Sequence, residues 1–167
     1  MEEQARTRLG IEADALFAQY LEKIETCVGT LDARQVWWRP NQASNSVGNL
    51  VLHLVGNLSQ WMLAGLGGLT YERERSAEFA ADGTATPDEL LRRLHEAMAE
   101  CRLLVRRLGE ADLARTVTVQ GRERDGFAVV LHAVEHAAYH TGQIVFIAKQ
   151  LVGDTTEIEF YPHLKHT

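Results

Sequence analysis

Residues 126–151 are the feature that most restricts what this chain can fold into. In this stretch Glu135 is the only Asp, Glu, Lys or Arg before Lys149. A helix that is apolar nearly all round is buried on several sides. We therefore expect a helix from Gly126, capped by Asp125, to about Leu151. Such a helix either lies in the middle of a bundle or covers a partner subunit.

Three earlier segments also show helical periodicity, with apolar residues recurring at steps of three and four. Each is bounded by residues that begin or end helices, such as the proline at Pro87 behind a threonine cap. Four long helices without strand repeats predict an all-α fold, an up-and-down four-helix bundle, as a single domain of residues 1–167. The three segments run from Leu9 to Cys27, from Val47 to about Gly65 after caps at Ser44 to Ser46, and from Thr86 to Leu108.

The connections are less regular. Tyr71 to Gly83 is a charged segment longer than most loops of a compact domain, and we expect it to form a lid or rim. Thr116 to Val119 alternates with period two and is followed by Gly121, which predicts a short hairpin or an extended linker before the last helix. The tail from Asp154 to Thr167 is expected to be strand or coil.

Composition excludes several classes of protein. There are 17 Lys and Arg against 23 Asp and Glu, a net charge of -6, and no basic block interleaves with aromatic residues, so we expect no nucleic-acid partner. Cys27 and Cys101 lie in apolar helical patterns without a C-x-x-C pair and are expected to be reduced. The acidic N-terminus does not resemble a signal peptide, and no apolar run reaches the roughly 20 residues of a membrane span. A cytoplasmic protein is expected, with no membrane partner. No nucleotide-binding glycine pattern occurs.

The histidines carry the chemical signal. Of seven, His132, His136 and His140 follow one another at four-residue steps in the last helix, and His53 lies inside the apolar second helix. Imidazoles four residues apart project from the same helix face and can bind one ion. A helical wheel turns His53, His136 and His140 toward the interior, and we predict these three as ligands of a divalent metal. Residues expected around them, as hydrogen-bond partners or pocket rim, are Asn57, His132 and Gln143.

Three neutral imidazoles leave a coordination position open, as in catalytic metal sites. Zinc is expected first because of its availability, with nickel, iron or manganese as alternatives, since imidazole alone does not identify the metal. Each ring should donate its second N–H to an acceptor such as Asn57, Gln143 or a helix carbonyl. A metalloprotease is not supported, because Glu135 directly precedes His136 and the H-E-x-x-H pattern is absent. The other interpretation is that the clustered histidines are ordinary hydrogen-bonded histidines; His95, His163 and His166 are expected to be ordinary in either case.

These residues resemble a known family. The stretch Trp37 to Asn41, the stretch Ser44 to Leu54 with its histidine, the glycine break from Gly65 to Gly68, and the sequence from His136 to Ile144 are similar to the DinB/YfiT-like superfamily of metalloenzymes, and to one of its uncharacterised small-protein branches. The resemblance covers nearly the whole chain. It implies a four-helix bundle, a divalent metal on His53, His136 and His140, and a homodimer.

The resemblance also implies relatives that use a low-molecular-weight thiol (bacillithiol, mycothiol or glutathione) or that hydrolyse small substrates. Our hypothesis is an enzyme whose metal activates a thiol or water, lowering its pKa, for S-transfer to, or hydrolysis of, a small electrophilic substrate. No catalytic side chain beyond this metal-bound thiol or water is predicted. The alternative is a non-catalytic protein of the stress response that binds metal or a small ligand. Substrate, thiol and metal identity do not follow from the sequence.

Overall fold

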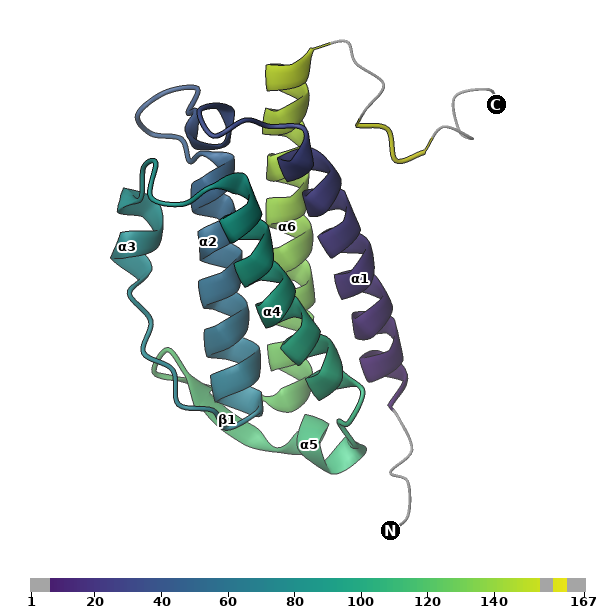
Figure 1. The fold of residues 1–167 in the computed structure, drawn as a ribbon. Helices are drawn as coiled ribbons and strands as arrows, with labels where there is room; N and C mark the ends of the chain where they lie inside the picture. The colour runs from purple at the N-terminus through teal and green to yellow at the C-terminus, as the bar shows by residue number, and fades with distance from the viewer. Residues whose placement is uncertain (1–6, 154–157, 162–167) are drawn as a thin grey trace.

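The computed structural model describes residues 7–153 and 158–161, and its core is a bundle of four long helices (Figure 1). The long helices are α1 (Arg8–Gly29), α2 (Val47–Leu58), α4 (Pro87–Val105) and α6 (Gly126–Val152). Three short helices, η1 (Gln35–Trp37), α3 (Arg75–Ala80) and α5 (Glu110–Ala114), lie in the connections, and the π-helical η2 (Ser59–Leu66) continues α2. The predicted all-α bundle is confirmed. Most of the tail expected to be strand or coil, including His163 and His166, lies outside the described residues.

The predicted helix starts have the expected caps. Ser46 forms a capping box with Asn49, Thr86 accepts from the backbone N–H of Glu89 with Pro87 in the first turn, and Asp125 accepts from Ala128. Glu89 lies three residues after Thr86, where a capping box would place a glutamate, but its carboxylate pairs with Arg93 and no capping box forms. Sequence patterning therefore locates the helices through the same side chains that satisfy their free backbone N–H groups.

One long crossover joins the end of η2 to the start of α4. Arg115 donates to the carbonyl of Leu66 at one end of the bundle, whereas the Trp37 indole donates to Ala85 at the other, so residues 67–86 lead the chain back along the outside of α2. As a result α2 and α4 run in the same direction (Figure 1), so the expected up-and-down order, in which successive helices alternate in direction, is not followed at this connection. The segment expected to be a lid or rim is this crossover, and it carries α3 past the middle of α2.

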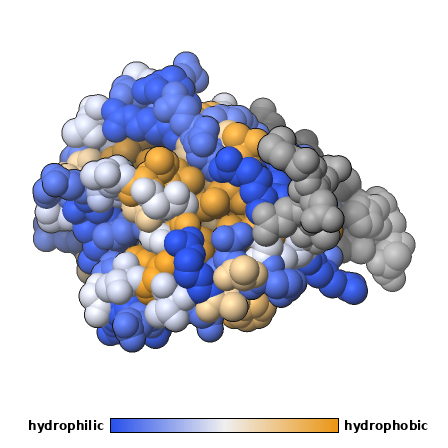
Figure 2. All heavy atoms as spheres, turned by 90° about the horizontal axis from the view of Figure 1, so that it is seen from below, coloured by the Kyte–Doolittle hydropathy of each residue, from blue (hydrophilic) through white to orange (hydrophobic). Residues whose placement is uncertain are grey.

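The predicted hairpin is present before the last helix. Strands β1 (Thr116–Val119) and β2 (Arg122–Asp125) pair antiparallel, with Thr116 opposite Asp125. Val119 is buried and lies against η2, where a Cβ on Gly65 would be 2.6 Å from its Cγ2. Seen from this end of the molecule, apolar residues gather in the middle and hydrophilic ones surround them (Figure 2). Glycine at position 65 thus lets the hairpin dock on η2.

The last helix packs against α1 and α2 along most of its length. Its opposite face leaves several large apolar side chains exposed, so it is not central to the bundle. Both cysteines are buried and unpaired, as expected. Among the described residues, no helix combines the length and apolarity needed to cross a bilayer.

Candidate metal centre

Three histidines from two helices meet inside the bundle. His53 of α2 is buried, and His136 and His140 come from successive turns of α6 beside it. One nitrogen from each ring can be chosen so that the three atoms lie within 4.8 Å of one another. The centroids of the His136 and His140 rings are 4.4 Å apart, and each lies 4.9 Å from that of His53. The structure therefore brings together the three side chains that the sequence singled out.

A carboxylate orients the ring of His53. Its Nδ1 lies 2.8 Å from Oε2 of Glu78, a residue of α3 that is also buried. Burial on its own raises the pKa of the Glu78 carboxyl, but hydrogen bonds from His53 and Arg73 outweigh it and hold the pKa below its usual range. An ionised carboxylate can only accept, so Nδ1 of His53 carries the proton. Its Nε2 then presents a lone pair toward the other two histidines.

The Glu78 carboxylate is itself fixed by an arginine. Arg73 Nε lies 2.6 Å from Oε1 and Nη2 lies 2.8 Å from Oε2, a bidentate pair. Glycine at position 56 makes room for this pair, since a Cβ there would be 2.0 Å from Oε1 of Glu78 and 2.9 Å from Nε of Arg73. The Asn49 amide donates to the backbone carbonyl of Glu78 at 2.9 Å and holds α3 against α2. The crossover thus supplies a clamped carboxylate to His53.

The two histidines of α6 are held neutral. Burial is the main cause that lowers the pKa of His136, with the neighbouring His140 and His53 rings adding to it, to about 3. Burial also lowers the pKa of His140, against a hydrogen bond with Gln143. Nδ1 of His140 lies 2.7 Å from Oε1 of Gln143, which leaves Nε2 as its free nitrogen. Near pH 7 both rings are therefore in the form that binds metal.

The arrangement fits one divalent ion. Two nitrogens bound to a tetrahedral ion at about 2.0–2.1 Å lie roughly 3.3 Å apart. Nε2 of His53 and Nε2 of His136 are 3.1 Å apart. The nitrogens of two neutral rings approach this closely only when a proton or a cation lies between them. Whether a proton or a cation lies at Nε2 of His136, its buried Nδ1 has no hydrogen-bond partner among the described residues, so the acceptor expected for the second N–H of this ring is not found.

The other predicted residues have different surroundings. Gln143 accepts from His140, as expected. Asn57 is buried beside the cluster, but its Oδ1 has no hydrogen-bond partner, so it is not the acceptor for His53. His132 packs its ring on Trp61, with the centroids 4.0 Å apart, and lies 5.5 Å from the ring of His136. Sequence reasoning missed Glu78 as the partner of His53. His95, assigned no role, contacts Glu25 at the surface.

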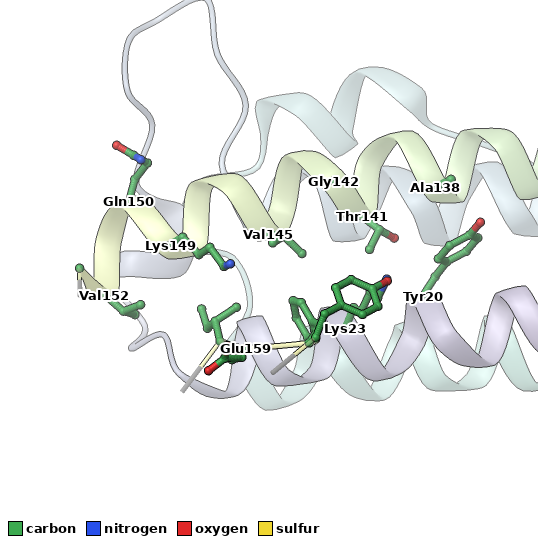
Figure 3. Close-up of a pocket in the computed structure, with 14 residues that line it drawn as sticks. Tyr20, Lys23, Ala138, Thr141, Gly142, Val145, Lys149, Gln150, Val152 and Glu159 are labelled. Atoms are coloured by element: carbon green, nitrogen blue, oxygen red, sulfur yellow. The ribbon is translucent and has the colours of Figure 1, made fainter. Parts of the chain in front are cut away.

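Two cavities flank α6. The smaller, ≈ 450 Å³, is lined by Trp61, Gln120, Arg122, Arg124 and His132, whose ring centroid lies 5.5 Å from that of His136; we call it the hairpin hollow. The larger, ≈ 890 Å³, lies between α1, α6 and the tail residues 158–161 (Figure 3). There Tyr20 and Thr141 point toward each other across the space, and Lys23 donates to Tyr161. None of the three clustered histidines is among the described residues that line either cavity, and His132 is the residue that connects the hairpin hollow to the cluster.

The fold and the cluster together define a DinB-like helical bundle with a candidate three-histidine metal centre. Residues 8–160 match the family model described as a protein of unknown function (DUF1572), and the chain belongs to that family. The helical fold implied by the resemblance to the DinB/YfiT-like superfamily is confirmed by solved structures of DinB-like proteins.

Among those structures is a conserved protein from Enterococcus faecalis, with 16% identity, a TM-score of 0.75, and coverage of 89% of this chain and 99% of that one. A DinB-like protein from Bacillus subtilis has 19% identity and a TM-score of 0.68, covering 90% and 96%. The mycothiol-dependent maleylpyruvate isomerase has 20% identity and a TM-score of 0.57 over 88% of this chain and 62% of its own length. The comparison with curated proteins found no match.

Proposed function

We propose that this protein is a metal-dependent enzyme that transfers a low-molecular-weight thiol to, or hydrolyses, a small electrophilic substrate. One observation carries the proposal: the ring nitrogens of His53, His136 and His140 converge, with His53 oriented by an ionised carboxylate. The likeness to a mycothiol-dependent isomerase supports the thiol, and three protein ligands support an open, catalytic position.

In this proposal the residues of the chain bind the metal ion and orient the rings that hold it. His53, His136 and His140 would hold the ion, and Glu78 and Gln143 would fix two of these rings in the tautomer that exposes Nε2. When bound, a divalent ion supplies Lewis-acid activation of a thiol or a water near neutral pH. His53 and His140 are buried and His136 is half-buried, which limits the access of bulk water to the site and strengthens its electrostatics. Zinc remains our first choice of metal.

The test begins with metal content. Protein purified without a metal-affinity step should carry about one equivalent of divalent metal, and His53→Ala and His136→Ala should carry almost none. His95→Ala is the matched control, because His95 lies at the surface, and it should keep the metal. Equal metal content in all four proteins would exclude these ligands.

The second stage measures turnover. Bacillithiol, mycothiol and glutathione are each incubated with an electrophile panel such as halo-aromatics and epoxides, and electrophile loss is followed with wild type and His136→Ala. We expect thiol-dependent loss that the variant abolishes. Metal binding without any turnover would instead support the alternative, a non-catalytic metal- or ligand-binding protein. The cytoplasmic location stays a prediction.

A further inference from the structure

Unsatisfied polar atoms mark a path out of the histidine cluster. His53, Asn57 and Trp61 follow one another at four-residue steps along α2 and into η2. Asn57 Oδ1 and Trp61 Nε1 are buried and have no hydrogen-bond partner. Leaving such a group unpaired costs about 1–3 kcal/mol each, so buried atoms of this kind usually await a partner. Both lie on the side of α2 that carries the candidate metal centre.

The path ends at the hairpin hollow. Trp61 is 7% exposed and lines this hollow together with His132, whose ring stacks on it. The residue sits in the π-helical η2, and π-helical turns occur frequently at functional sites. An indole N–H is a donor only, and Nε1 is buried behind the residues that line the hollow, so it calls for an acceptor that reaches below that surface.

The outer wall of the hollow is cationic. Arg122 and Arg124 of β2 alternate with Glu123 and Asp125, so the two arginines share one face of the strand. Both arginines line the hollow, and no acidic residue is among its described lining residues. Two guanidinium groups without a carboxylate between them favour an oxyanion, which they can bind bidentately.

The hairpin is also tied to the candidate metal centre. Gln120, in the turn, has a left-handed φ of 53°, an unusual conformation for a residue other than glycine. Its amide donates to Oε1 of Gln60, which also accepts from Nη1 of Arg73, the residue that clamps Glu78. Gly121, the second residue of this two-residue turn, has a φ of 71°, so the left-handed conformation is the one the hairpin turn requires, and the hydrogen bonds link this turn to the residue that clamps Glu78.

We propose that the hairpin hollow binds the oxyanion group, carboxylate or phosphate, of a small organic ligand whose reacting end lies toward the histidine cluster. Arg122 and Arg124 bind the anion, and Trp61 Nε1 donates to an acceptor on the same molecule. This inference rests on the proposed function, because it defines the substrate or thiol that the candidate metal centre uses. It predicts a ligand that combines a negative charge with an apolar, stackable body.

The test is calorimetric titration of the full-length, zinc-loaded protein with benzoate, phenyl phosphate and the neutral benzyl alcohol. Either anion should bind about tenfold or more tightly than the alcohol, since a charged hydrogen bond contributes at least 1.4 kcal/mol. Tighter binding of benzoate assigns a carboxylate ligand, and tighter binding of phenyl phosphate assigns a phosphate. Trp61→Phe, which keeps the ring and removes the N–H, should weaken anion binding severalfold.

The decisive variant is Arg122→Gln with Arg124→Gln, which should lose anion affinity about tenfold while its zinc content stays unchanged. Arg92→Gln with Arg107→Gln removes the same charge elsewhere on the surface and should bind the anion as wild type does. Equal loss in both double variants, no loss in either, or equal binding of the alcohol would overturn the inference. Wild-type protein that holds no metal would overturn the proposed function, whatever its anion affinity.

Discussion

Glu78 of the crossover holds His53 of α2 through a 2.8 Å contact between carboxylate Oε2 and ring Nδ1. Partners of metal-binding histidines typically contribute 10–100-fold to metal affinity. We therefore expect Glu78→Gln to weaken zinc binding by about tenfold, because the amide lacks the charge that favours the Nδ1–H tautomer. Competition against a chromophoric chelator measures the affinity.

Glu74→Gln is the control for this prediction, because Glu74 is exposed on the same crossover. It should bind zinc with wild-type affinity. Circular dichroism of both variants shows whether the helices remain. A folded Glu78→Gln protein with unchanged zinc affinity would remove Glu78 from the site.

The sequence predicted the side chains of the cluster and Gln143, the partner of His140, but not Glu78, the partner of His53. His53, His136 and His140 were accessible because helical spacing alone sets which face each ring occupies. Glu78 was not, because its position depends on how residues 67–86 return along α2, and no periodicity encodes that path. The signal that existed was indirect: a glycine at position 56 in an otherwise good helix, which is needed for close approach of another group.

The fold shows the same division. Caps and apolar stripes predicted the four long helices, because the start of each helix and its buried face are set by residues close together in the sequence. The short helices α3 and α5 were missed, since they are only 6 and 5 residues long and depend on tertiary contacts. The shared direction of α2 and α4 was missed as well, because a long connection permits either direction.

Gly56→Ala should damage the candidate metal centre without touching a ligand. The added methyl group would be 2.0 Å from Oε1 of Glu78, so the carboxylate and Arg73 must move. We expect overpacking of about 1–3 kcal/mol to exceed the roughly 1 kcal/mol gained in helix propensity, and zinc affinity to fall. Urea unfolding of the metal-free protein and the chelator competition measure the two effects.

The matched control is Gly142→Ala in the middle of α6. Nothing lies within 4 Å of a Cβ at this position. This variant should gain about 0.5–1 kcal/mol of stability from helix propensity and bind zinc normally. If Gly56→Ala is also stabilised and binds zinc normally, Glu78 and Arg73 can move away from the added methyl group without loss of stability or zinc affinity, which would contradict this prediction.

The exposed face of α6 is where we expect the predicted homodimer to form. Phe127, Leu131, Tyr139 and Phe146 are 49%, 52%, 62% and 66% exposed on this helix, in a stripe interrupted by a single charge at Glu135. Apolar side chains grouped on one face are typical of an interface. Phe146→Glu should convert a dimer to a monomer in light scattering, whereas Leu103→Glu on α4, 48% exposed, should not. A monomeric wild type would contradict this prediction.

Asp14 of α1 gives a pH-dependent contribution to stability that is independent of the metal. Its carboxylate accepts from Arg102 at 2.5 Å and from Arg106 at 2.8 Å, and both arginines lie at the C-terminal end of α4. Burial raises the pKa of the Asp14 carboxyl, but these arginine hydrogen bonds outweigh it and lower the pKa below its ordinary value. A carboxyl with a lowered folded-state pKa stabilises the protein above its unfolded-state pKa, about 3.9, and loses that contribution as the pH falls through the folded-state value.

Asp14→Asn should therefore be less stable than wild type by about 1 kcal/mol at pH 7, since the pair is partly solvent-screened. The difference should stay constant down to about pH 5 and shrink toward zero below about pH 4. Urea unfolding of both metal-free proteins between pH 3 and pH 7 measures it, and taking the difference cancels the titration of the histidines and of Glu78. A gap that widened on acidification would mean that the aspartate is destabilised by burial, with the arginines failing to compensate.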